Sequence, residues 1–156
     1  MSLFENVKKN FGLGCMRLPM KGDEVDCGEF CRMADYFMES GFNYFDTARV
    51  YLGTKSESAI RDCIVRRYPR ESFILTDKLS TSLFNSEEEI RPLFELQLES
   101  CGVDYFDFYL MHAQSKNIFE KYKKCRAYEQ AMEFKKEGRI HKQNSGENTH
   151  GKQSKI

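Results

Sequence analysis

A strand pattern followed by a helix pattern recurs along this chain at a nearly constant interval. Short apolar segments begin at positions 11, 42, 73 and 106, which places them 31, 31 and 33 residues apart. This interval fits one strand, one helix and their connections, and it lets each strand return parallel to the one before it. The repeat therefore predicts an α/β fold with a parallel sheet, built either as an open doubly wound sheet or as a barrel.

Each repeat contains an apolar segment typical of a strand and a longer segment with helical spacing. Strands are predicted at residues 11–18, 42–46, 73–77 and 106–111, and helices at residues 26–40, 56–67 and 86–101, with a fourth helix that ends near Glu137. Asp26 and Glu29 have the spacing of a capping box, and Gly41 and Gly138 are placed to end helices in the left-handed conformation. Pro92 lies inside the third helix and should kink it or delay its start.

The composition is typical of one globular domain and argues against two classes of partner. Of the 156 residues, 40% are apolar and 31% charged, and the 24 basic residues balance the 24 acidic ones. A net charge of zero gives no overall attraction to nucleic acid or to anionic membranes. Basic clusters at residues 66–70 and 121–126 are interpreted as solvated helix exteriors. The N-terminus lacks the apolar core of a signal sequence, so we expect a cytoplasmic location.

The six cysteines do not have the spacing of a disulfide framework or of a zinc site. No Cys-x-x-Cys pair occurs, and most of them lie within apolar periodic segments, which predicts buried free thiols. Cys27 and Cys31 are four residues apart on a helix and could touch one metal ion, but we favour core or half-exposed thiols and expect no metal site. The cysteines are Cys15, Cys27, Cys31, Cys63, Cys101 and Cys125.

Four polar residues follow the ends of consecutive predicted strands. The loops at the carboxyl ends of parallel strands converge on one crevice, so we expect these side chains to meet there. They are Asp46 at the end of the second strand, Tyr51 in the loop after it, Lys78 at the end of the third strand and His112 at the end of the fourth.

These four residue types together are suited to general acid catalysis on a carbonyl group. A phenol has a pKa near 10, so Tyr51 would act as a general acid at neutral pH with help from a nearby cation, Lys78, anchored by Asp46. A neutral His112 imidazole would orient a carbonyl oxygen beside the phenol. The alternative is structural: a turn cap, an ion pair, a packed ring and a core histidine. We favour the functional interpretation because all four residues follow consecutive strands.

Three ordered motifs give the chain a family resemblance. Residues 41–51, with the sequence GFNYFDTARVY, resemble the first signature of the aldo-keto reductases. Residues 73–79, FILTDKL, are similar to the lysine strand of that family. Residues 98–112, LESCGVDYFDFYLMH, are similar to its fourth-strand histidine signature. The resemblance extends over roughly residues 10–140.

Three further segments are most similar to one bacterial branch of the family. They are residues 11–19, 51–57 and 68–73. Members of this branch often carry a C-terminal iron-sulfur segment. The sequence contains no such segment, so we expect no iron-sulfur cluster in this chain.

The resemblance implies a (β/α)8 TIM barrel that binds NADP(H) or NAD(H) and reduces an aldehyde or a ketone. The catalytic residues that it implies are Asp46, Tyr51, Lys78 and His112, with Tyr51 as the acid. The cofactor-binding residues that it implies, near the nicotinamide, are Gly14, Cys15, Met16 and Asp46.

The repeat breaks off where a fifth strand is due. Ile140 is apolar, but no apolar residue follows it before Ile156. We therefore expect residues 1–140 to be the N-terminal half of the barrel, its first four βα units, and residues 141–156 to be a polar, disordered tail.

Such a half-barrel would carry the catalytic residues and lack most of the cofactor site. It would be a reductase that is incomplete alone, or a truncated, non-catalytic assembly or interaction element. In both cases its exposed strand edges would pair with a second copy or a complementary half.

Overall fold

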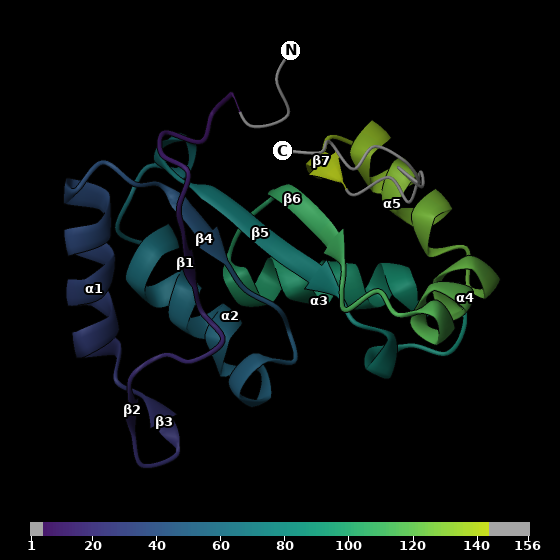
Figure 1. The fold of residues 1–156 in the computed structure, drawn as a ribbon, viewed down its shortest axis with the longest axis horizontal. Helices are drawn as coiled ribbons and strands as arrows, with labels where there is room; N and C mark the ends of the chain where they lie inside the picture. The colour runs from purple at the N-terminus through teal and green to yellow at the C-terminus, as the bar shows by residue number, and fades with distance from the viewer. Residues whose placement is uncertain (1–4, 144–156) are drawn as a thin grey trace, which may run out of the picture.

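A parallel five-stranded sheet forms the centre of the computed structural model, which describes residues 5–143 (Figure 1). The strand order is β1-β4-β5-β6-β7, and all four pairings are parallel. The strands are β1 (Gly12–Gly14), β4 (Tyr44–Asp46), β5 (Ile74–Leu79), β6 (Phe106–Met111) and β7 (Ile140–Gln143). This order confirms the predicted α/β fold with a parallel sheet.

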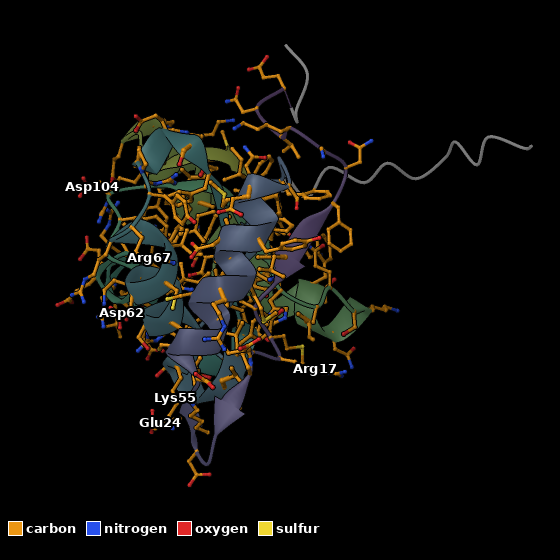
Figure 2. All side chains as sticks on the ribbon, turned by 90° about the vertical axis from the view of Figure 1, so that its left-hand side faces the viewer. Arg17, Glu24, Lys55, Asp62, Arg67 and Asp104 are labelled. Atoms are coloured by element: carbon orange, nitrogen blue, oxygen red, sulfur yellow. The ribbon has the colours of Figure 1, made fainter. Side chains whose placement is uncertain are left out.

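A small antiparallel hairpin of β2 (Met20–Lys21) and β3 (Glu24–Val25) lies between β1 and the first helix. The side chains of Lys55 and Glu24 form an ion pair of 2.8 Å that ties this hairpin to the second helix (Figure 2). The sequence analysis did not predict the hairpin. The helices are α1 (Cys27–Glu39), α2 (Lys55–Ile60), α3 (Ile90–Cys101), α4 (Lys116–Lys124) and α5 (Ala127–Lys136).

Two predicted helices differ from the observed ones. The second continues from α2 through one π-helical turn, η2 (Arg61–Val65). The fourth is divided into α4 and α5 at Arg126, which has a positive φ of 52°. Pro92 delays the start of α3 as predicted: it occupies the third helical position, where its missing N–H leaves no intrahelical hydrogen bond unmade.

The predicted ends of α1 are confirmed in part. The Asp26 carboxylate accepts a hydrogen bond from the Glu29 backbone N–H at 3.1 Å, and Gly41 follows the helix with φ of +82°. The reciprocal half of the capping box is absent from this end of α1, because the Asp26 N–H donates to the Pro19 carbonyl at 2.8 Å instead. The Glu29 carboxylate pairs with Arg32.

The core lies between the sheet and the helices that cover it, with α1, α2 and α3 on one side in Figure 1. Alternate strand residues point to opposite faces, so Phe45, Leu75 and Tyr109 pack toward the helices. Aromatic contacts then join the layers: the Phe94 ring lies 5.0 Å from the Tyr109 ring and 4.1 Å from the Phe134 ring. Burial of these rings stabilises the packing of the sheet against its helices.

The prediction that no strand follows residue 140 was wrong. Ile140–Gln143 forms β7, which pairs in parallel with β6 in the register Phe106↔Ile140 and Phe108↔Lys142. An edge strand is held by backbone hydrogen bonds, which do not require apolar side chains, and one buried residue, Ile140, anchors it. The sheet thus has a fifth strand beyond the predicted four βα units. Residues 144–156 of the predicted tail lie outside the described residues.

The prediction of free thiols is confirmed for all six cysteines. The prediction of burial holds for four of them, whereas Cys31 is half-buried and Cys27 is exposed.

In the predicted basic cluster at residues 66–70, each of the three arginines pairs with a carboxylate, namely Asp62, Asp35 or Asp107. Over residues 5–143, no helix has the length and apolar character needed to cross a bilayer.

Candidate active site

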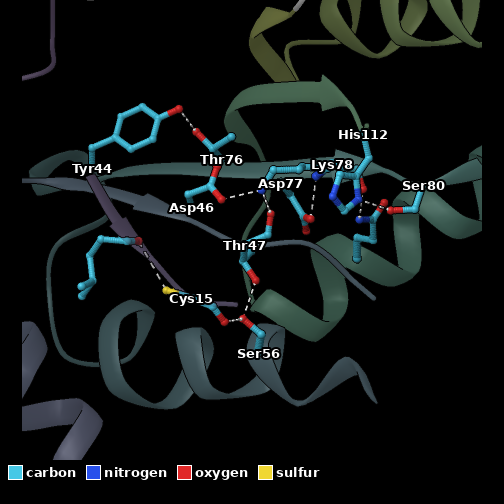
Figure 3. A network of polar contacts seen from close by, with 12 residues as sticks. Cys15, Tyr44, Asp46, Thr47, Ser56, Thr76, Asp77, Lys78, Ser80 and His112 are labelled. Atoms are coloured by element: carbon cyan, nitrogen blue, oxygen red, sulfur yellow. Dashed lines mark hydrogen bonds and ion pairs between the residues drawn. The ribbon is translucent and has the colours of Figure 1, made fainter. Parts of the chain in front are cut away.

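The carboxyl ends of three neighbouring strands bring polar side chains together (Figure 3). Asp46 is the last residue of β4, Lys78 is the last but one of β5, and His112 directly follows β6. The strand register pairs Asp46 with Thr76 and Lys78 with Leu110, so these ends lie at the same edge of the sheet. The edge is the one at which parallel α/β folds place their chemistry.

The Lys78 ammonium group is held by two oxygens. Its Nζ atom donates to Asp46 Oδ1 at 2.5 Å and to the Thr47 carbonyl oxygen at 2.7 Å. The Lys78 side chain is 11% exposed and the Asp46 side chain 29% exposed. A nearly buried ammonium is tolerated only when it is paired and hydrogen-bonded, which is the case here. The geometry therefore fixes a positive charge at the edge of the sheet.

Tyr51 reaches this charge from the turn η1 (Tyr51–Thr54) that follows β4. The Lys78 Nζ atom lies 4.8 Å from the centre of the Tyr51 ring. Three consecutive residues after Tyr51 have positive φ, and two of them, Leu52 (52°) and Thr54 (78°), are not glycine. Such conformations are strained and persist only where the surrounding structure imposes them. This strained turn places the Tyr51 ring beside the Lys78 ammonium group.

His112 completes the group. Its ring lies 5.7 Å from the Tyr51 ring in an edge-to-face arrangement, and its Nδ1 atom is 2.7 Å from Ser80 Oγ. Burial, followed by the positive charge of Lys78, lowers the pKa of His112 below 6.5, against an opposing effect of Asp46. The imidazole is therefore neutral at pH 7. Among the described residues, Nε2 makes no hydrogen bond and remains available for a ligand.

The four residues predicted to bind the cofactor differ in what they present at the carboxyl edge of the sheet. Gly14 pairs with Asp46 across β1 and β4, and a Cβ atom built on Gly14 would meet nothing within 4 Å. Met16 is 53% exposed. The Cys15 thiol is buried in the core, and this burial raises its pKa to about 12. Only the backbone of Cys15 lies beside the site, where its N–H donates to the Asp46 carbonyl at 2.8 Å.

The sequence analysis did not identify the residues whose hydrogen bonds position Lys78 and His112. Ser80, which holds His112, follows Lys78 by two positions, so the strand period alone could have placed it on the same face. Gln97 donates to the Lys78 carbonyl at 3.0 Å and accepts a hydrogen bond from the buried Tyr109 hydroxyl at 2.6 Å. No sequence signal identifies Gln97, because its partners come from two other elements.

A buried acidic group lies beneath Lys78, on the helix side of β5. Oxygen and sulfur atoms of Glu57, Asp77 and Cys101 lie within 4.8 Å of one another. Glu57 Oε2 pairs with Arg49 at 2.6 Å, and Asp77 Oδ1 accepts a hydrogen bond from the Lys78 backbone N–H at 2.7 Å. Burial, and then the charge of Glu57, raises the pKa of Asp77 well above its usual value. Burial likewise raises the pKa of Glu57, against the opposing charge of Arg49.

One cavity lies away from this edge, at the amino ends of β1 and β4. Its volume is about 300 Å³, and it is lined by Val7, Asn10, Phe11, Gly12 and Tyr44. None of the predicted catalytic residues borders this cavity.

The strand order and the position of the polar edge define the class of this chain: it is part of a TIM-type (β/α)8 barrel. The profile of the aldo/keto reductase family matches residues 10–146, and the chain belongs to that family. This confirms the family resemblance carried by the three sequence motifs.

Named relatives and solved structures agree with this assignment. The chain is 34% identical over 106 residues to 4-dihydromethyl-trisporate dehydrogenase of Mucor mucedo, a match that covers 65% of this chain and 30% of that protein. It is 30% identical over 136 residues to dihydrodiol dehydrogenase 3 of Bos taurus, covering 74% and 41%. The chain thus spans less than half the length of these relatives.

Among solved structures, the holo form of aldo-keto reductase AKR11C1 from Bacillus halodurans is 28% identical with a TM-score of 0.66. That match covers 85% of this chain and 44% of the other. The thermostable aldo-keto reductase Tm1743 has a TM-score of 0.69 at 20% identity, covers 88% of this chain and 51% of the other, and supports the fold alone.

Proposed function

We propose that this chain takes part in the NAD(P)H-dependent reduction of an aldehyde or a ketone, with Tyr51 as the general acid. The observation that carries the proposal is the convergence of Tyr51 on the Lys78–Asp46 pair and His112. Relatives named as dehydrogenases and as an NAD(P)H-dependent D-xylose reductase support this reaction class. The proposal includes a cytoplasmic location and no iron-sulfur cluster in this chain.

The residues present fit the nicotinamide end of such a cofactor. The open space over Gly14 lets a flat ring approach the backbone, and a side chain at that position would fill it. Gly14, Met16, the Cys15 backbone and Asp46 would hold this end beside Tyr51. When bound, NAD(P)H supplies the hydride that the carbonyl carbon receives.

The chain's own residues handle the proton. Tyr51 donates its hydroxyl proton to the carbonyl oxygen, and the resulting phenolate is stabilised by the Lys78 ammonium 4.8 Å from the ring centre. Asp46 and the Thr47 carbonyl fix that ammonium group. The neutral His112 imidazole, oriented by Ser80, hydrogen-bonds the carbonyl oxygen through Nε2 and aligns it with the phenol.

We further propose that turnover requires a complementary half of the barrel. The chain covers 44% and 53% of two solved structures to which it is similar. A (β/α)8 barrel places its remaining loops, which complete the crevice at the carboxyl edge, after strands absent from residues 5–143. The catalytic residues would then lie in one half and most of the cofactor contacts in the other.

The first test is a calorimetric titration of NADPH into the chain, alone and mixed with a C-terminal half of a related reductase, followed by a carbonyl reduction assay. We expect binding and turnover in the mixture, and a loss of about 10²-fold or more in turnover on Tyr51→Phe. Tyr36→Phe is the matched control, because Tyr36 is 75% exposed on α1. Equal turnover by the two variants would contradict the role of Tyr51.

A second candidate is a non-catalytic assembly or interaction element. Within residues 5–143, β1 and β7 are the edge strands of the sheet, each paired on one side. Phe11, beside β1, is 62% exposed and Met16 is 53% exposed. An apolar, half-paired edge favours association with a second copy or with a complementary half. Binding of a half-barrel without any NADPH-dependent turnover would favour this candidate over the first.

A further inference from the structure

Three of the six cysteines gather where α1 packs on the turn η2. Cys27 and Cys31 occupy successive turns of α1, and Cys63 lies in η2. Their exposure is graded: Cys27 is exposed, Cys31 is half-buried and Cys63 is fully buried. None of the three takes part in the proposed proton chemistry.

The buried thiol contacts both cysteines of α1. The Cys63 thiol donates to the Cys27 carbonyl oxygen, with the sulfur 3.4 Å from it. Burial raises the pKa of Cys63, and hydrogen bonding with the thiols of Cys31 and Cys27 raises it further. Cys63 is therefore a buried, protonated thiol that interacts with both cysteines of α1.

Arg67 brings the backbones of Cys31 and Cys63 together. Its Nη1 atom donates to the Cys63 carbonyl at 3.1 Å and to the Cys31 carbonyl at 3.5 Å, so one guanidinium nitrogen bridges the two residues. Its Nη2 atom pairs with Asp35 on α1 at 2.7 Å. Figure 2 shows Arg67 on the side of the molecule where these elements meet. These contacts of Arg67 hold α1 and η2 together.

The two cysteines differ in the way that an oxidisable pair requires. Cys31 is half-buried, so a small oxidant can reach it, and its backbone carbonyl lies against the Arg67 guanidinium group. Cys63 is sheltered and protonated, so it does not meet an oxidant itself. It is placed to attack a modified Cys31 from the inner side.

We propose that Cys31 and Cys63 form an intramolecular disulfide when the chain meets a hydroperoxide. With hydrogen peroxide as the oxidant, the Cys31 sulfur attacks one peroxide oxygen, the O–O bond breaks, and the sulfur becomes a sulfenic acid while the thiol proton leaves with the other oxygen as water. The Cys63 sulfur then attacks the Cys31 sulfur, the S–O bond breaks, and the Cys63 proton leaves with the departing oxygen as a second water. Two thiols are oxidised and one hydroperoxide is reduced.

This disulfide would close the segment that contains β4 and the strained turn after Tyr51. Residues 32–62 lie between the two cysteines, and they include both Asp46 and Tyr51. Cross-linking the ends of this segment restricts the unfolded chain, so oxidation should raise the melting temperature. The modification would thus stabilise the part of the chain that carries the proposed acid.

The test is treatment of the folded full chain with one equivalent of hydrogen peroxide. We expect an intact mass lower by two hydrogens, a fall from six to four in the thiols counted after denaturation, and a Cys31–Cys63 cross-linked peptide in a non-reducing digest. Cys27→Ser should behave like the unmodified sequence. Cys31→Ser should lose the cross-link and the rise in melting temperature.

Three outcomes would overturn the proposal. They are six free thiols after treatment, oxidation of Cys31 to a sulfinic acid without a link to Cys63, and a cross-link that involves Cys27 in the unmodified sequence. Circular dichroism of Cys31→Ser before treatment checks that the variant is folded, because a half-buried position tolerates the exchange of sulfur for oxygen. The presence or absence of the Cys31–Cys63 cross-linked peptide in the unmodified sequence tests the proposal without any variant.

Discussion

His112 links the site to the pH dependence of stability. Burial and the Lys78 charge lower its pKa in the folded chain, whereas in the unfolded chain it titrates near 6.5. Between these two values the unfolded chain binds the extra proton, so stability falls as the pH drops through 6.5 toward the folded pKa. Above 6.5 the imidazole is neutral in both states and contributes no pH dependence.

We therefore predict that His112→Asn removes one component of the acid sensitivity. Urea unfolding midpoints measured from about pH 7.5 down to about pH 5 should fall more steeply for the unmodified sequence than for the variant. The difference between the two curves isolates His112 from the other titrating groups. Parallel curves over that range would contradict a lowered pKa at this residue.

The two glycines of β1 make a matched pair of tests. A Cβ atom at Gly12 would lie 2.7 Å from Tyr44 Cδ1, whereas a Cβ atom at Gly14 would meet nothing within 4 Å. Gly12→Ala should therefore lower the free energy of unfolding by about 1–3 kcal/mol through overpacking. Gly14→Ala should change it by less than about 1 kcal/mol.

The same pair separates folding from cofactor binding. Gly14→Ala should weaken NADPH binding to the completed barrel, because it fills the open space proposed for the nicotinamide. Chemical unfolding and calorimetric titration of both variants measure the two effects separately. A Gly14→Ala variant that binds NADPH normally would remove this residue from the proposed cofactor site.

At the scale of elements, Asp107 joins two neighbouring strands. Its Oδ2 atom accepts hydrogen bonds from the Leu75 backbone N–H of β5 at 2.9 Å and from Arg70 Nη2 at 2.7 Å. The carboxylate lies on β6 and is 12% exposed. Arg70 also donates to the Tyr105 carbonyl at 3.0 Å, so its guanidinium group ties the start of both strands.

We predict that Asp107→Ala lowers the free energy of unfolding by about 3 kcal/mol, because it leaves a half-buried guanidinium group and a strand N–H without their partner. Asp104→Ala is the control, since Asp104 lies at the surface in the loop before β6 (Figure 2). Guanidinium chloride unfolding of both variants measures the effect. A similar change in the two variants would show that Asp107 does not join the strands energetically.

At the scale of the whole molecule, the edges of the sheet govern association. β1 and β7 end the five-stranded sheet, and Phe11 exposes an apolar ring next to β1. We predict that the chain self-associates at micromolar concentration and that Phe11→Lys shifts it toward the monomer, because a lysine at an edge opposes strand pairing. Sedimentation velocity measures both. A well-folded monomer of the unmodified sequence would argue against pairing through these edges.

The sequence by itself determined the four strand–helix repeats, the parallel sheet and the identity of the residues at its carboxyl edge. The 31-residue repeat reflects local physics: apolar runs, helical spacing, Asp26 at a helix start and glycines at helix ends. Asp46, Lys78 and His112 could be assigned to one edge because parallel strands all end on the same side. These features depend only on neighbours in the chain and on the rule for parallel strands.

Only the tertiary structure decided which atoms meet. The strand β7 forms because β6 offers it a backbone edge, although its own residues after Ile140 are polar. The support of Lys78 by Gln97, and the contact of Cys63 with α1, join segments about 20 to 36 residues apart. Hydrogen-bond geometry between such segments depends on packing in three dimensions, and no local sequence pattern carries that information.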